Sequence, residues 1–112
     1  MKPIIIQNSK IPVYLSIFIS IYAITLFPFI ISRDEMDEIT IRHECIHIEQ
    51  QRELWVIPFY LLYGFYWLKG KIAGMSNDDA YFNIPFEKEA YRKMYDEDYL
   101  EKREKHAWKK YT

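Results

Sequence analysis

Two histidines and a glutamate lie close together at His43-Glu44-Cys45-Ile46-His47, which is an H-E-x-x-H sequence. On a helix this spacing places the two imidazoles one turn apart on the same face, where both can bind one zinc ion. Glu44 lies beside them and can act as a general base on a metal-activated water molecule. The motif therefore predicts a catalytic zinc centre built on His43 and His47.

A third ligand for such a centre is offered further along the chain by Glu87. Proline favours the first turn of a helix, so Pro85 predicts a helix that continues through about Tyr95. The face of this helix that carries Glu87 also carries Ala90, Tyr91 and Met94. Glu89 points elsewhere, and we expect it to face solvent. Glu87 is therefore the carboxylate that we expect to face inward.

The H-E-x-x-H sequence followed by a helical Glu87 resembles the gluzincin group of zinc metallopeptidases, and the small size resembles its minimal members, the minigluzincins. The resemblance covers roughly residues 24–94. It implies that the two motif histidines and Glu87 bind zinc, that Glu44 is the general base, and that a strand at about residues 24–31 borders the substrate cleft. The chain departs from many relatives at Tyr91, where they carry an acidic or amide residue. The residue that holds the ligand histidines in position is therefore left unassigned.

The chemistry follows from the ligand set. His43, His47 and Glu87 would leave the fourth position of a tetrahedral zinc ion open for water. Glu44 can take a proton from that water, so that hydroxide attacks a polarised carbonyl, and can return the proton to a leaving amine. A tetrahedral oxyanion also requires a hydrogen-bond donor besides zinc. The sequence offers Tyr91, Tyr95 and His106 without choosing among them, and Tyr91 also suits a place in the core.

The motif needs a helix to position it, and the flanking residues predict one from about Glu38 to Glu53. Asp34 or Asp37 can cap its start, where acidic side chains suit the positive end of the helix dipole. At about 100° per residue, an apolar stripe lies opposite the histidines. The stripe consists of Ile41, Cys45 and Ile48. We therefore expect the cysteine to pack in the core and not to bind metal.

Residues 11–31 are apolar and carry no charge. Their number meets the roughly 20 residues that a membrane span requires. Pro12 and Pro28 bracket the segment, and β-branched residues dominate it. These features favour a short helix from Pro12 to about Ser20, followed by a buried strand from about Tyr22 to Ile31. Periodicity does not separate these alternatives, so a membrane segment and a buried helix and strand both remain open.

Three more segments complete the chain. Residues 54–68 predict an apolar helix, buried or interfacial, that backs the motif helix, and residues 69–71 predict its end at a glycine. Residues 75–83 predict a polar loop. Residues 96–109 predict a C-terminal helix that packs through its aromatic side chains. Some minimal gluzincins are latent, and the resemblance suggests that residues 96–112 fold back over the zinc site.

Length and composition limit the fold and the partners. A chain of 112 residues, half of them hydrophobic, can form one domain with a real core. A net charge of -1 gives no basic surface for nucleic acid. A single cysteine excludes an intramolecular disulfide and a multi-cysteine zinc site. We predict a single zincin-like domain over residues 1–112, with an α+β, mainly helical fold and a small β element before the motif helix.

The leading hypothesis is a zinc-dependent metallopeptidase that hydrolyses peptide bonds in peptide or protein substrates. One alternative is a catalytically idle zinc-binding domain. Another is a small membrane-associated interaction protein in which the H-E-x-x-H sequence is incidental. The localisation stays open between cytoplasm and membrane, because an apolar surface would suit membrane association and a homodimer equally.

Overall fold

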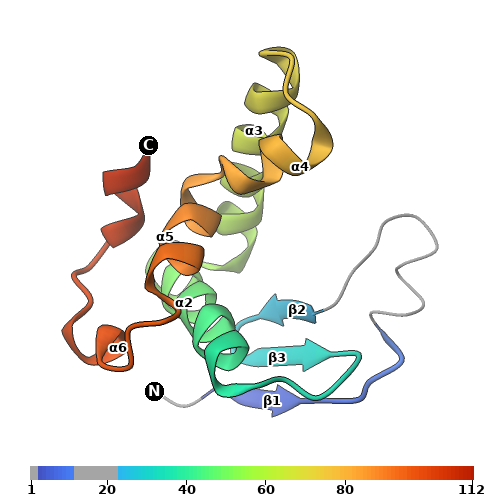
Figure 1. Ribbon diagram of the computed structural model, residues 1–112, viewed down its shortest axis with the longest axis vertical. Helices are drawn as coiled ribbons and strands as arrows, with labels where there is room; N and C mark the ends of the chain where they lie inside the picture. The colour runs from blue at the N-terminus through green and yellow to red at the C-terminus, as the bar shows by residue number, and fades with distance from the viewer. Residues whose placement is uncertain (1–2, 12–22) are drawn as a thin grey trace.

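The computed structural model describes residues 3–11 and 23–112. Strands β1 (Ile4–Ile6), β2 (Ala23–Leu26) and β3 (Phe29–Ser32) form one sheet in the order β1-β3-β2. Strand β1 runs parallel to β3, and β2 runs antiparallel to it. The helices follow the sheet in the chain (Figure 1). The α+β, mainly helical fold class is therefore confirmed, as is the small β element before the motif helix.

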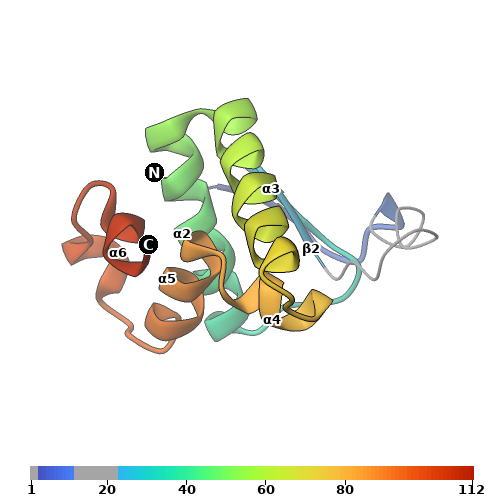
Figure 2. The same ribbon diagram turned by 90° about the horizontal axis from the view of Figure 1, so that it is seen from above.

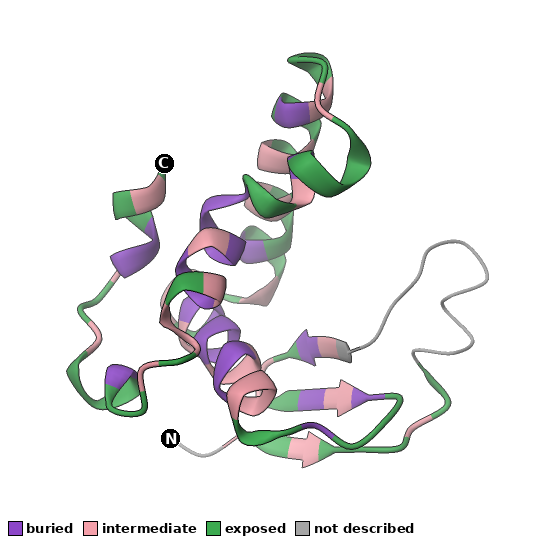
Figure 3. Ribbon diagram, in the orientation of Figure 1, coloured by how far each residue is buried: buried purple, intermediate pink, exposed green. Residues whose placement is uncertain are grey.

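Helix α2 lies against β2 and β3 and packs with the helices α3 and α5. They are α2 (Glu38–Leu54), α3 (Val56–Ile72), α4 (Asn77–Phe82), α5 (Pro85–Lys93), α6 (Tyr99–Lys102) and the 3₁₀ helix η1 (Ala107–Tyr111). Helix α5 packs on α2, and η1 packs on α5 on the side away from the sheet (Figure 1, Figure 2). Helix α2 is therefore enclosed by other elements on several sides, and Figure 3 shows it buried over much of its length.

The second half of the apolar segment 11–31 is a hairpin and not one strand. Leu26 pairs with Phe29, so Phe27 and Pro28 form the turn between β2 and β3. Proline has no N–H to donate to a strand ladder, which explains why the ladder is interrupted there. The one strand expected from about Tyr22 to Ile31 is therefore two strands and a turn, and these strands exclude the alternative of a single helix over residues 11–31. The expected helix from Pro12 to about Ser20 lies outside the described residues. No helix in the part of the chain that the structure describes is long and apolar enough to cross a bilayer.

Helix α2 begins and packs as its sequence predicts. Asp37 caps it by accepting a hydrogen bond from the backbone N–H of Thr40 at 2.7 Å. The predicted stripe of Ile41, Cys45 and Ile48 packs with Ile30 and Met36 against the sheet. Burial raises the pKa of Cys45 to about 11, so its side chain is a neutral thiol in the core. A further face of α2, around Ile46, packs against Ala90 and Tyr99.

Helix α3 continues through the predicted glycine stop. Gly70 lies inside the helix, where a Cβ atom would be 3.1 Å from the Cα and Cβ atoms of Ala80 in α4. This glycine permits a close approach of two helices, and the turn comes at Gly74, which has a φ of 92°. The predicted loop over residues 75–83 is also wrong, because Ser76 accepts a hydrogen bond from the Asp79 N–H and so caps α4.

The C-terminal segment, residues 96–112, contains two short helical pieces in place of the one predicted helix. His106 has a φ of 58°, a left-handed conformation that interrupts a helix between α6 and η1. Trp108 then enters a core cluster with Phe59, Ile84 and Phe86. The segment packs on α5, where Trp108 contacts Phe86 and Tyr99 and Arg103 contact Glu89. That it covers the zinc site stays a prediction.

The outer face of α3 is apolar and exposed. Five large side chains along it are each more than half exposed, namely Ile57, Leu61, Phe65, Leu68 and Ile72. All of these side chains except Ile72 come from the apolar run of residues 54–68. Association with a membrane or with a second copy of the chain stays a prediction.

Candidate metal centre

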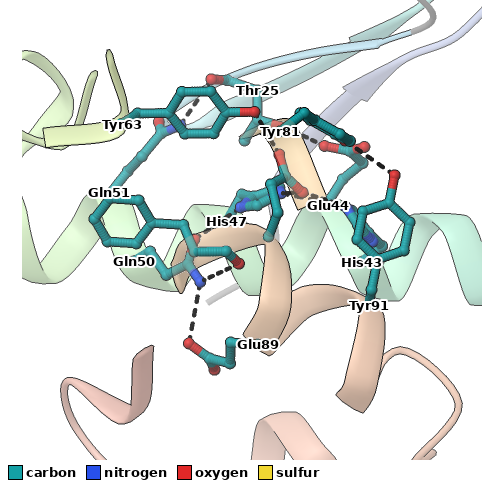
Figure 4. A network of polar contacts seen from close by, with 12 residues as sticks. Thr25, His43, Glu44, His47, Gln50, Gln51, Tyr63, Tyr81, Glu89 and Tyr91 are labelled. Carbon is teal, nitrogen blue, oxygen red and sulfur yellow. Dashed lines mark hydrogen bonds and ion pairs between the residues drawn. The ribbon is translucent and has the colours of Figure 1, made fainter. Parts of the chain in front are cut away.

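Three ligand atoms meet where α2 packs on α5. Nε2 of His43 and Nε2 of His47 lie 3.1 and 3.0 Å from Oε1 of Glu87, and 3.2 Å from each other. The three side chains are only 4–6% exposed. This buried group could hold a metal ion, as the sequence predicts. Figure 4 shows both histidines on the same stretch of α2.

The charges in this group are strongly coupled. Burial disfavours a charged His47, but the nearby carboxylates and hydrogen bonds outweigh it and raise the pKa of His47 to about 9. Burial would also disfavour the Glu87 carboxylate, yet the two histidines lower its pKa well below the ordinary value. Without a metal ion, a proton on His47 therefore compensates the charge of Glu87. A bound cation would replace that proton.

Tyr63 restricts how Glu87 can bind a metal. Its hydroxyl donates a hydrogen bond to Oε2 of Glu87 at 2.7 Å, while Oε1 faces the histidines. Burial raises the pKa of Tyr63 far above its usual range, so the hydroxyl keeps its proton. Glu87 is thereby oriented to offer a single oxygen to a metal.

Glu44 lies at the side of the group that faces β2. The Thr25 hydroxyl donates a hydrogen bond to Oε2 of Glu44 at 2.5 Å. Glu44 is only half-buried, in contrast to the three ligands. The predicted general base is thus the most accessible carboxylate at the site, and the predicted bordering strand contacts it.

Gln51 fixes β2 in that position. Its side-chain amide donates to the Thr25 carbonyl at 2.7 Å and accepts from the Phe27 N–H at 2.6 Å (Figure 4). The Tyr60 hydroxyl donates to the same Thr25 carbonyl. Helices α2 and α3 therefore hold this edge strand against Glu44.

The candidate oxyanion donors lie in different places. The ring of Tyr91 packs edge-on against the His43 ring, with centroids 4.4 Å apart, and its hydroxyl is 2.9 Å from the Tyr81 hydroxyl. Tyr95 is exposed. His106 lies in the C-terminal segment, where its backbone N–H donates to Glu53. The structure therefore brings Tyr91 to the ligands, as a packing partner of His43.

Glu89 departs most from its prediction. It is 0% exposed, whereas the sequence pattern predicted a solvent-facing side chain. Helix α5 has α2 on one side and η1 on another, so a pattern with a single buried face does not describe it. The prediction fails because a segment distant in sequence covers Glu89.

Sequence reasoning missed several polar side chains around the ligands. They are Thr25, Gln50, Gln51, Tyr63 and Glu89. The two glutamines carried a usable signal, because they follow His47 by three and four positions on the same helix and so lie near its face. The others come from elements whose approach the motif does not specify.

The chain matches no known family model, no curated protein and no solved structure. The functional proposal therefore rests on the residues of the site and on the resemblance that their motif carries.

Proposed function

We propose that the chain is a small zinc-dependent metallopeptidase. The observation that carries the proposal is the convergence of His43, His47 and Glu87 beside the half-buried Glu44. The two histidines lie on α2, and Glu87 lies on α5, 44 and 40 positions further along the chain. An incidental H-E-x-x-H sequence on a surface helix would not require such a meeting.

The donor set and its spacing support zinc as the metal. Two imidazole nitrogens and one carboxylate oxygen are a ligand set used by catalytic zinc sites, with a fourth position left for water. In a tetrahedral centre with ligands about 2.0 Å from the metal, ligand atoms are about 3.3 Å apart. The three atoms here are separated by 3.0–3.2 Å, which is close to that value.

The roles of the residues follow from their positions. A zinc ion at this site would supply Lewis acidity, lowering the pKa of a water molecule and polarising a substrate carbonyl. Glu44 would accept the proton of that water and deliver it to the leaving amine. Thr25 would hold the Glu44 carboxylate in place through its hydroxyl. The resemblance to gluzincins supports the peptide bond as the substrate.

A catalytically idle zinc-binding domain is the second candidate, and one observation favours it. Glu44 is already hydrogen-bonded to Thr25, and the carbonyl of Thr25 accepts from Gln51 and Tyr60. In an idle domain the same three ligands would bind zinc. The hydrogen bond between Glu44 and Thr25 of β2 would then serve only to hold the strand against the helix. The two candidates share the metal and differ in turnover.

The first experiment measures metal content by elemental analysis of the purified full-length chain, with His43→Ala and Glu87→Ala as test variants. We expect one zinc per chain in the wild type and a large loss in both variants. His106→Asn and Glu49→Gln are the matched controls, because each changes the same residue type outside the site and asparagine tolerates the left-handed backbone at position 106. Wild-type protein that takes up no zinc would refute both candidates.

The second experiment separates the two candidates. Glu44→Gln should retain zinc, because Glu44 is not among the three converging ligands. If the chain is a peptidase, this variant should lose hydrolysis of a quenched fluorescent peptide library that the wild type cleaves. A zinc-loaded wild type that cleaves no peptide of the library would favour the idle domain.

A further inference from the structure

Glu89 is a buried carboxylate that the metal site does not use directly. Four polar contacts surround it: Arg103 Nε at 2.5 Å and Nη2 at 3.1 Å, the Tyr99 hydroxyl at 2.7 Å, and the Gln50 side-chain amide at 3.0 Å. A buried charge is costly unless it is paired and hydrogen-bonded, and this one is both. Arg103 and Tyr99 belong to the C-terminal segment, so that segment holds Glu89 in place.

Gln50 connects Glu89 to the ligand His47. Its NH₂ group donates to Oε1 of Glu89 and to the Phe86 carbonyl, each at 3.0 Å. Its carbonyl oxygen lies 2.7 Å from Nδ1 of His47 (Figure 4). A carboxylate and a backbone carbonyl can only accept hydrogen bonds, so the NH₂ end of Gln50 must face them. The carbonyl end is left to accept from His47.

The orientation of Gln50 determines which nitrogen of His47 is free. Because the Gln50 oxygen accepts, Nδ1 of His47 must carry a hydrogen. In the neutral ring Nε2 then has a lone pair, and Nε2 is the atom that faces Glu87 and His43. In the other tautomer Nε2 would carry the hydrogen and could not bind a metal ion.

We infer that Gln50 and Glu89 are positioning residues of the metal centre: Glu89, together with the Phe86 carbonyl, orients the Gln50 amide, and Gln50 fixes His47 in its metal-binding tautomer. The C-terminal segment supports the metal centre through its hold on Glu89. This inference rests on the metal site proposed above. It also supplies the support of a ligand histidine that the sequence left unassigned at Tyr91.

The inference is tested with Glu89→Gln in the full-length chain. A glutamine at position 89 can donate as well as accept, so only the Phe86 carbonyl would still favour the present orientation of Gln50. The Gln50 amide could then turn over and present its NH₂ group to His47. We expect zinc affinity, measured by competition with a chromophoric chelator, to fall by about 10- to 100-fold. In ¹⁵N-labelled protein, the Nδ1–H signal of His47 should be slow to exchange with water in the wild type and fast in the variant.

Two further variants make the test specific. Glu53→Gln is the matched control, because Glu53 also accepts from Arg103, at 3.1 Å, and has no hydrogen bond to Gln50. It should keep the zinc affinity and the protected Nδ1–H signal. Gln50→Met removes the link without leaving a charge unpaired, since Arg103 still pairs with Glu89. Gln50→Met should lose zinc affinity and the protected Nδ1–H signal as Glu89→Gln does. It therefore keeps the inference testable if Glu89→Gln folds poorly.

The outcomes distinguish this inference from the proposed function. Wild-type zinc affinity and a protected Nδ1–H signal in Gln50→Met would overturn the inference and leave the metal site standing. Equal losses in Glu53→Gln would also overturn it, because they would reflect disturbed packing. A wild type that binds no zinc would refute the proposed function, while the Nδ1–H signal would still report whether Gln50 and Glu89 orient His47.

Discussion

The residue that decides the behaviour of the site is His47, because a proton and a metal ion compete for its Nε2 lone pair. Glu87 stabilises either positive charge at that position. Burial alone would favour the neutral ring, so the raised pKa of His47 reflects the surrounding carboxylates and hydrogen bonds. The metal site and the proton site are therefore the same place, and we expect metal binding to release a proton at neutral pH.

This competition predicts a pH dependence of stability in zinc-free protein. The pKa of Glu87 is lowered from 4.5, so its contribution is present above pH 4.5 and is lost as the pH falls. The pKa of His47 is raised from 6.5 to about 9, so its contribution is present below pH 6.5 and is lost as the pH rises through about 9. The difference in free energy of unfolding between the wild type and Glu87→Gln should be largest between about pH 4.5 and 6.5.

The measurement is chemical denaturation in a chelator at a series of pH values, repeated with zinc. Zinc should remove the loss on the alkaline side, because the cation takes the place of the proton. Glu49→Gln serves as the control, since Glu49 pairs with Arg52 at the surface of the same helix. A difference between wild type and Glu87→Gln that is the same from pH 5 to 9 without zinc would contradict this account of the pair.

At the scale of elements, polar side chains of α2 attach both the strand and the glutamate helix. Gln51 contacts β2 and Gln50 contacts α5, so two adjacent glutamines hold the two walls of the site. We expect Gln51→Leu to destabilise the protein by about 1–3 kcal/mol, because the Phe27 N–H loses its acceptor. Hydrogen exchange at Phe27 should accelerate. Tyr60→Phe should have a smaller effect, since Gln51 still donates to the Thr25 carbonyl; equal effects would show that Gln51 is not what holds the strand.

The packing of α3 on α4 gives a prediction with an internal control. Gly70→Ala should be destabilised by about 1–3 kcal/mol relative to Gly64→Ala, because the new methyl group would crowd Ala80 and Met75. Gly64 lies in the same helix with nothing within 4 Å of its Cβ position, so alanine there should stabilise by about 0.5–1 kcal/mol. Thermal unfolding of both variants makes the comparison. Equal midpoints would mean that α4 can move aside.

The same elements show what local sequence can and cannot predict. Helix α2 and Glu87 were predictable because a capping residue, a helical period and a proline at a first turn are local signals. The turn at Phe27 and Pro28 was not predictable, because both residues lie inside a continuous apolar run that reads equally as one strand. The helix α4 was missed because the polar residues after Ser76 suit a helix start as well as a loop. The burial of Glu89 depends on Arg103, fourteen positions away, and no local period reports such a contact.

For the whole molecule, the C-terminal segment belongs to the core that supports the metal centre. Trp108 packs with Phe59 and Phe86, and Phe59 lies edge-on to the His47 ring at 6.2 Å. Arg103 links Glu53 of α2 to Glu89 of α5. The segment therefore ties together the two helices that supply the ligands, and its loss should affect folding and metal binding together.

This leads to a prediction for the tail as part of one cooperative unit. Trp108→Ala should lower the free energy of unfolding by about 3–5 kcal/mol through the cavity that it leaves. Trp108→Phe should cost much less, because the indole N–H has no hydrogen-bond partner among the described residues and a ring still fills the space. Lys109→Ala, at an exposed neighbouring position, is the control. Denaturation should be followed by far-ultraviolet circular dichroism and by zinc release, and both transitions should shift together. An unchanged midpoint of zinc release in Trp108→Ala would contradict this prediction. It would mean that the C-terminal segment docks on a metal-binding unit that is stable without it. The support of His47 through Glu89 would then have to arise within α2 and α5 alone.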